Sequence, residues 1–193
     1  MNNSTNNVCF AICIEASHQK GMGHLFRAIN IINLLKEKNH NYILLINNDP
    51  KSINIIKNEK INFEIVNLYD FNSNWETSII NKYNPTIWLN DRLDTNIQHA
   101  YFVKNNSIKL ITFDDYGSGA NIADLNIIAI PAKPLDNIKT NKILTGLDYI
   151  ILNPEIKKYR KLRSSAQKII ISLGGSDTYN VTSKVINTIK HNN

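Results

Sequence analysis

The chain has 193 residues, of which 42% are hydrophobic and 20% charged, and a formal net charge of +6. This composition is that of a folded soluble protein and excludes a disordered chain. The length corresponds to one complete domain plus a fragment of a second, because domains usually contain about 100–150 residues.

The excess of positive charge gathers in one segment late in the chain. Its members are Lys157, Lys158, Arg160, Lys161, Arg163 and Lys168. Only Tyr159 lies among them, so the segment lacks the row of aromatic side chains on which nucleic-acid bases stack. We expect a solvated linker and no nucleic-acid partner, with the overall sign suited to an anionic small ligand.

Membrane and secretion signals are missing from the sequence. No apolar run approaches 18 residues, and the polar residues 1–7 differ from a signal peptide. Cys9 and Cys13 are four apart on one predicted strand, which puts both thiols on the same face and beyond disulfide reach. We expect buried thiols, a cytoplasmic location and no membrane association.

Apolar runs and polar segments alternate in the order expected of βαβ units. Strands are predicted at residues 8–14, 42–46, 63–66, 86–89, 108–113 and 125–130. Most segments between them over the first hundred residues are long enough for crossover helices. Continuous apolar strands covered by helices on both faces predict an α/β fold with a Rossmann-like, doubly wound parallel sheet.

A glycine-rich turn follows the first strand and opens a helix that covers residues 25–35. Residues 21–27 read GMGHLFR. Gly21, Met22 and Gly23 would offer backbone N–H groups to a phosphate at the helix N-terminus, and His24 would take a proton from water or a hydroxyl. Two simpler functions for the turn are a tight bend and a helix-capping histidine. Phe26 occupies the third glycine position of a dinucleotide fingerprint, so we reject an NAD enzyme.

Three loops are expected to converge at the carboxyl ends of the strands. Arg27 lies one helical turn from His24 and would contact a phosphate or pair with a loop acid. Asp91 and Arg92 are candidate sugar or phosphate ligands, with Asn90 or Asp94 as alternative helix caps. Asp114 and Asp115 form too small a group for a magnesium site, so we expect loop acids or a hydrogen-bond acceptor, no metal and no cofactor.

A second strand-to-helix turn begins late in the chain. After the basic segment 153–167, residues 169–173 are predicted as a strand, followed by Gly174, Gly175 and Ser176 and a helix over 181–189 with Thr178 or Asn180 as its cap. The division is therefore 1–152 as the N-terminal domain, 153–167 as a linker and 168–193 as the start of a truncated C-terminal Rossmann-like domain.

Taken together, the motifs resemble a known family. They are Glu15-Ala-Ser, residues 21–27, NDRLDT at 90–95, FDDYGSGANIAD at 113–124, GLDYIIL at 146–152 and ISLGGSD at 171–177. In this order they resemble the nucleotide-sugar hydrolase of pseudaminic acid biosynthesis and its relatives known as spore coat polysaccharide biosynthesis proteins. The resemblance covers nearly the whole chain.

The resemblance implies a fold, a reaction and a set of site residues. The fold would be the N-terminal half of a GT-B-like architecture, similar to the N-acetylglucosaminyl transferase of peptidoglycan synthesis. The reaction would be inverting, metal-free cleavage of a UDP-linked acetamido deoxy sugar at its anomeric carbon, giving UDP and free sugar. His24 would be the general base. The diphosphate would bind the two glycine-rich turns, with Asp91, Arg92 and Asn180 as further contacts.

Three functions stay open from the sequence. The family commonly has Asp-His-Tyr where this chain has Asn90-Asp91-Arg92, which removes an aromatic sugar contact and implies a different sugar. A hydrolase and a GT-B glycosyltransferase would share the same turns and histidine. The early end of the second domain leaves a third function, an inactive sugar-nucleotide binding module, or a chain completed by a second polypeptide that supplies the missing domain.

Overall fold

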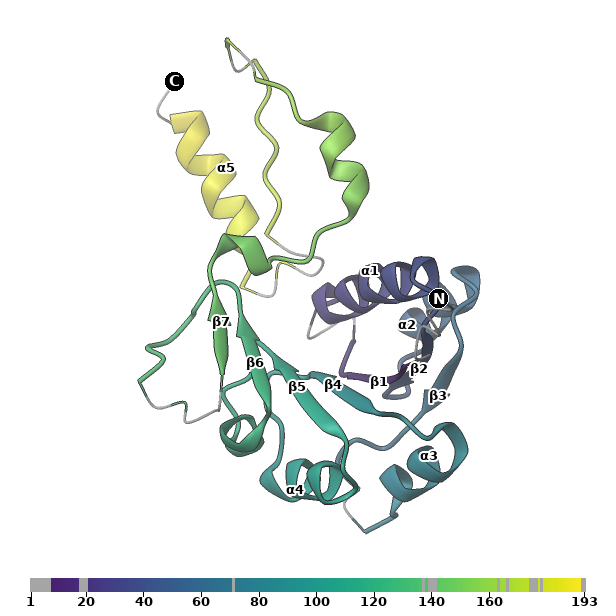
Figure 1. Ribbon diagram of the computed structural model, residues 1–193. Helices are drawn as coiled ribbons and strands as arrows, with labels where there is room; N and C mark the ends of the chain where they lie inside the picture. Colours follow the sequence, from purple (N-terminus) through teal and green to yellow (C-terminus); the bar gives the residue numbers. More distant parts are fainter. Residues whose placement is uncertain are drawn as a thin grey trace, which may run out of the picture.

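Seven parallel strands form the central sheet of the computed structural model (Figure 1). The structure describes residues 8–17, 21–70, 72–136, 138, 142–162, 164–165, 167–173, 177 and 179–191. The strands are β1 (Cys9–Ile14), β2 (Asn41–Ile46), β3 (Phe63–Ile65), β4 (Ile87–Asp91), β5 (Lys109–Phe113), β6 (Leu125–Ile128) and β7 (Ile143–Thr145). Their order is β3-β2-β1-β4-β5-β6-β7, and each listed pair is parallel. The predicted α/β, Rossmann-like doubly wound sheet is confirmed.

Helices cover both faces of this sheet (Figure 1). The helices α1 (Gly23–Glu37) and α2 (Pro50–Asn58) lie on one face, and α3 (Trp75–Tyr83) and α4 (Ile97–Asn105) lie on the other. The central strands therefore bury alternate residues in two separate cores. In β1, Ile12 and Ile14 pack with α1, whereas Ala11 and Cys13 pack with the core of α3 and α4. Burial on both faces explains the continuous apolar runs in the sequence.

The strand order reverses between β1 and β4, which are neighbours in the sheet but far apart in the sequence. Ile14 at the end of β1 is paired in register with Asp91 at the end of β4. Open α/β sheets bind ligands outside the carboxyl ends of strands at such a reversal. The fold therefore brings the glycine-rich turn after β1 next to the polar loop after β4.

Four details differ from the sequence prediction. The strand β6 ends at Ile128, two residues early, and the three-residue β7 was not predicted, because so short a run carries little periodicity. Residues 169–173 form no strand, so that prediction was wrong. Ile170 is 91% exposed, and within the described residues no neighbouring strand supplies the hydrogen bonds that a strand requires. Cys9 is half-buried and only Cys13 is buried, and burial raises the pKa of the Cys13 thiol to about 11.

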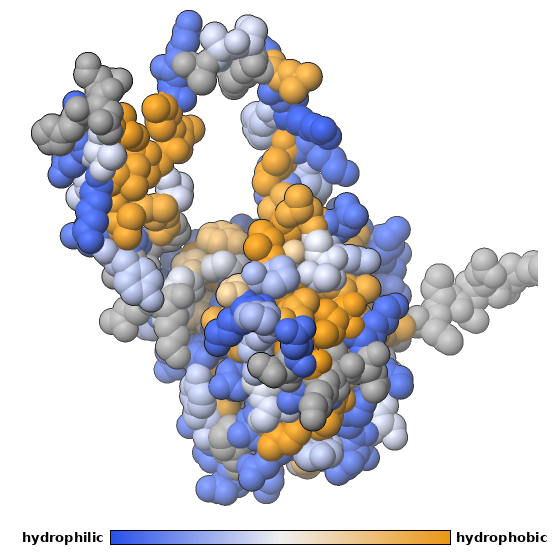
Figure 2. Space-filling model, turned by 90° about the vertical axis from the view of Figure 1, so that its left-hand side faces the viewer, coloured by the Kyte–Doolittle hydropathy of each residue, from blue (hydrophilic) through white to orange (hydrophobic). Residues whose placement is uncertain are grey.

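The chain beyond β7 carries two short 3-10 helices, η2 (Leu147–Tyr149) and η3 (Pro154–Tyr159), and ends in α5 (Val181–His191). Residues 153–162 are exposed, as expected of a solvated linker. Figure 2 shows this part as an arch above the body, with hydrophobic side chains along the inner side of one limb. The division into domains stays a prediction.

A buried aromatic cluster joins α3 and α4 to the sheet. His99 stacks on Trp75 and meets Trp88 edge-on, with ring centroids 5.8 and 5.4 Å away. Its Nδ1 lies 2.9 Å from the Glu76 carboxylate. Burial lowers the pKa of His99, the charge of Arg92 lowers it further, and the hydrogen bond to Glu76 opposes both. The ring is therefore neutral in the folded protein at neutral pH.

This burial predicts a loss of stability in mild acid. The unfolded chain binds a proton at His99 near its ordinary pKa of 6.5 and the folded chain does not, so the free energy of unfolding falls as the pH drops below 6.5. Urea unfolding at pH 7.5 and 5.5 measures the change. His99→Gln removes this contribution, and an equal pH dependence in the variant and the wild type would contradict the assignment.

Candidate functional site

A histidine and a buried carboxylate form the centre of the site. His24 is the second residue of α1, and Asp91 is the last residue of β4. Nδ1 of His24 lies 2.6 Å from Oδ1 of Asp91, whose side chain is 1% exposed against 18% for His24. A carboxylate only accepts hydrogen bonds, so Nδ1 carries the proton, and in the neutral ring Nε2 has the free lone pair. This is the tautomer that a general base requires.

Arg27 pairs with two acids at the neighbouring strand ends. It donates from Nε and Nη2 to the two oxygens of Asp91, both at 2.7 Å, and from Nη1 to Oδ2 of Asp114 at 2.5 Å. Its guanidinium also lies over the Phe113 ring, 5.3 Å from the centroid. Burial lowers the pKa of Arg27, but its hydrogen bonds and attraction to the two carboxylates outweigh that effect and raise the pKa overall. Of the two predicted roles, the structure shows the ion pair with loop acids.

Hydrogen bonds among residues that directly follow β1 and β2 fix the glycine-rich turn. Gly21 has a φ of +102°, a left-handed conformation that favours glycine, and its N–H donates to the Ser17 carbonyl. The Asn47 side chain bonds both the N–H and the carbonyl of Ala16, each at 2.9 Å. Met22 is the N-cap of α1 and makes no side-chain cap, and His24 does not cap the helix either. The first turn of α1 contains no acidic residue, so its positive end is available to an anion.

Buried hydrogen bonds fasten the loop after β4 to the loop after β5. Asp115 accepts from the hydroxyl and the N–H of Thr95, and Thr95 also accepts from Asn90 at 3.1 Å. Burial raises the pKa of Asp115, although the Thr95 and Gly117 hydrogen bonds oppose the rise. Asn90 and Asp115 are the chain neighbours of Asp91 and Asp114. The network therefore sets the spacing of the two carboxylates that hold Arg27.

Other predicted site residues take different places. Arg92 is buried beneath the loops, donates to the Leu68 carbonyl at 3.2 Å and lies over the Tyr69 ring. Asn180 is exposed in the turn before α5, whose first N–H groups bond Asp177 and not Asn180, so the capping prediction for Asn180 was wrong. Gly174, Gly175, Ser176 and Thr178 lie outside the described residues.

The cap of α4 also differs from the prediction. The side chain of Asn96 accepts from the Gln98 N–H at 2.7 Å, so neither Asn90 nor Asp94 is the N-cap. Asn90 is used inside the loop network, because its amide also accepts from the Trp88 indole.

Two hollows meet at the Arg27 side chain. The first, the His24 hollow, has a volume of about 460 Å³ and is lined by Gly21, Gly23, His24, Phe26, Arg27, Asn30 and residues 151–153. The second has about 450 Å³ and lies between Arg27, Asp114 and apolar side chains that include Leu93. Both volumes fall in the range of about 300–1,000 Å³ typical of small-molecule sites.

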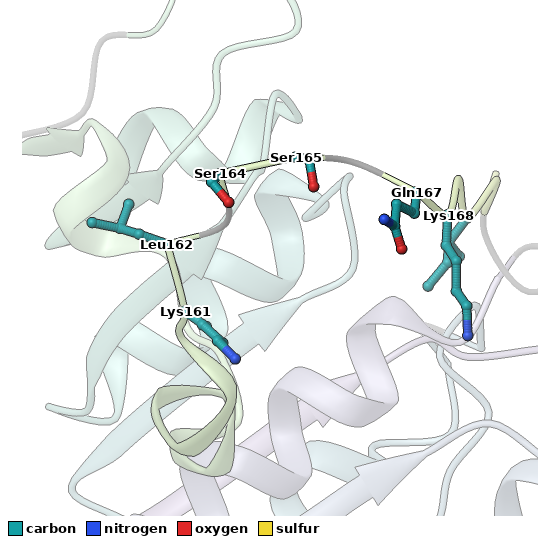
Figure 3. A pocket seen from close by; sticks show the side chains of 7 residues that line it. Lys161, Leu162, Ser164, Ser165, Gln167 and Lys168 are labelled. Carbon is teal, nitrogen blue, oxygen red and sulfur yellow. The ribbon is translucent and has the colours of Figure 1, made fainter.

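A third hollow is separate from this site. It measures about 630 Å³ and is lined by seven residues of the single stretch 161–170, six of them labelled in Figure 3. Leu162 within this stretch is fully exposed, and Ile170 nearly so. Its whole lining comes from this one exposed segment.

Among the described residues, no group of three His, Cys, Asp or Glu side chains is placed to hold a metal ion. Nor is any helix in the described ranges both long enough and apolar enough to span a membrane.

The chain is similar to known proteins in sequence and in structure. No protein-family model matches the chain. An uncharacterized protein of Methanocaldococcus jannaschii is 31% identical over 189 residues, which cover 91% of this chain and 38% of that protein. The chain thus spans about two-fifths of the length of this relative. The crystal structure of Acinetobacter baumannii MurG is similar with a TM-score of 0.47 and 11% identity, over 65% of this chain and 42% of that one.

Removal of Arg27 should cost much of the fold's stability. Arg27→Ala leaves the Asp91 carboxylate buried without its cation, and breaking a buried pair in this way costs about 3–5 kcal/mol in the free energy of unfolding. Urea unfolding at neutral pH measures the loss. Asn33→Ala, at an exposed position of the same helix, should change stability by less than about 0.5 kcal/mol. Equal stabilities for the two variants would contradict the pairing.

Proposed function

We propose that this chain is the base-carrying, N-terminal half of a GT-B-like enzyme that cleaves a UDP-linked acetamido deoxy sugar with water. The observation that supports the proposal most is the 2.6 Å contact between Nδ1 of His24 and Asp91, beside an open hollow at the strand-order reversal. The sequence motifs that resemble the hydrolase family supply the substrate class. The products are UDP and the free sugar of a surface polysaccharide or nonulosonic acid pathway.

The reaction uses His24 as its proton acceptor. Nε2 takes a proton from a water in the His24 hollow while the water oxygen bonds to the anomeric carbon. The bond from this carbon to the phosphate oxygen breaks, and its electron pair leaves with UDP. Asp91 stabilises the imidazolium that forms. Attack on the face opposite the leaving group inverts the anomeric carbon, and no carboxylate nucleophile is needed.

The charge at the site favours a second domain as the source of most contacts to the diphosphate. Arg27 carries one positive charge against the two carboxylates of Asp91 and Asp114, so it is not free to bind a phosphate. The N–H groups of Gly23 and His24 at the start of α1 can face one phosphate oxygen. We assign most diphosphate contacts to the turn at Gly174, Gly175 and Ser176 and to a domain that continues from it or is supplied by a second polypeptide.

A glycosyltransferase is the second candidate. The His24 hollow of about 460 Å³ is far larger than the roughly 30 Å³ of a water molecule, so it has room for an acceptor hydroxyl on a larger molecule. The two reactions differ in one requirement. A hydrolase releases UDP without an acceptor, and a transferase releases it only when an acceptor is added. Two free cysteines favour a reducing, cytoplasmic compartment for either reaction.

Loss of the histidine should abolish turnover. For the full chain supplied with a UDP-linked diacetamido sugar, His24→Ala should slow UDP release by about 10²–10⁴-fold, the usual contribution of a general base. His40→Gln is the matched control, because His40 lies at the opposite end of α1 beside Phe10 and should leave the rate unchanged.

Two outcomes would contradict the proposal. Equal UDP release by His24→Ala and the wild type would exclude His24 as the base. Binding of the UDP-sugar by the wild type with no UDP release, with or without acceptor, would indicate the non-catalytic binding module.

A further inference from the structure

The hollow on the far side of Arg27 from His24 contains two non-glycine residues in the left-handed backbone region. Leu93 has a φ of +67° and Asp114 a φ of +47°. Both follow strand ends, and both line this hollow, which we call the Leu93 pocket. Asparagine and aspartate tolerate the left-handed region, but leucine has no polar group to compensate the strain. Strain of this kind gathers at ligand-binding sites.

Burial of the side chain does not explain why a leucine stands there. Leu93 is 54% exposed, and Ile130 on the same wall is 65% exposed. Ile150 and Ile151 extend the apolar lining. Four branched side chains therefore line a hollow of about 450 Å³, and two of them, Leu93 and Ile130, leave more than half of their surface uncovered, which an apolar group of a ligand would bury.

The lining also contains the polar and charged side chains of Arg27, Asp114, Tyr116 and Lys133, and the Lys133 ammonium lies over the Tyr116 ring. Asp114 is 29% exposed and gives one oxygen, Oδ2, to Arg27. A carboxylate has about four lone-pair positions, so Asp114 keeps the capacity to accept from a hydroxyl or an amide N–H. The lining therefore suits a ligand that carries both methyl groups and hydrogen-bond donors. It shares Arg27 and Ile151 with the His24 hollow, so one molecule can extend through both.

We propose that the Leu93 pocket binds the N-acylated, deoxygenated part of the sugar, with Leu93 as the residue that selects it. This rests on the proposed function for the identity of the ligand as a sugar. Acyl or deoxy methyl groups lie against Leu93 and Ile130, and Asp114 accepts from an amide N–H or a hydroxyl. Leu93 is strained because its side chain is placed for the ligand and not for the fold.

Leu93→Asn separates these two roles. Asparagine fits the left-handed backbone, so the urea midpoint of unfolding should hold or rise, while the apolar wall is lost. The probes are N-acetylglucosamine, which carries one acyl methyl, and glucose, which has none. By saturation-transfer NMR and titration, the wild type should bind N-acetylglucosamine about tenfold more tightly than glucose, and Leu93→Asn should remove this preference. Leu162→Asn, at a fully exposed leucine outside both hollows, should change neither property.

Two results would overturn the pocket assignment. One is an unchanged preference for N-acetylglucosamine in Leu93→Asn, and the other is a fall in its unfolding midpoint, which would show that Leu93 serves the fold. Failure of the proposed function is distinguishable. If His24→Ala leaves turnover intact while Leu93→Asn still abolishes the preference, the sugar-binding role of the Leu93 pocket holds and the role of His24 as the general base is wrong.

Discussion

The structure around the strand-order reversal depends on one buried carboxylate. Asp91 ends a central strand with its side chain 1% exposed, and a charge in that position is stable only when it is paired and hydrogen-bonded. Its hydrogen-bond partners among the described residues, His24 and Arg27, come from the first two turns of α1. The contacts of His24 and Arg27 with Asp91 therefore help to fix the position of α1 on the sheet. The same contacts give His24 its orientation and its tautomer.

The two acids at the strand ends have different surroundings and different uses. Asp91 is fully enclosed and binds both α1 side chains, so it orients the base. Asp114 is partly exposed and holds Arg27 with one oxygen, so it can also face a ligand. A hydrogen-bond network beneath the loops, built on Thr95 and Asp115, sets the distance between them. Because one cation serves both acids, the site suits a neutral sugar better than a diphosphate.

The fold could be predicted from the sequence because its strands are buried on both faces. Six of the seven strands correspond to predicted runs that are mainly apolar, and β7 was not predicted. Residues 169–173 look like a strand for the same reason, but a strand also needs a hydrogen-bonded neighbour, which local sequence does not reveal. A run of apolar residues predicts a buried strand, but the strand forms only where a neighbouring strand supplies its backbone hydrogen bonds.

The site could be predicted only in part. The glycine-rich turn and its histidine were visible because Gly21, Gly23 and His24 stand directly after a strand. Arg27 was correctly placed beside His24 by helical spacing, but the choice between phosphate and loop acid depended on contacts 64 and 87 residues away along the chain. Asn47, which anchors the turn, was missed, although a polar residue directly after an apolar strand was the available signal. Leu93 gives no sequence signal, because strain is a property of the backbone.

The tautomer of His24 tests the central claim most directly. Long-range ¹H–¹⁵N correlation of the histidine side chains at neutral pH reports which ring nitrogen carries the proton. The contact with Asp91 predicts the Nδ1–H form, with Nε2 unprotonated, and a return toward the mixture of free histidine in Asp91→Ala. An Nε2–H form in the wild type would mean that the lone pair faces Asp91, and His24 could not then act as the base.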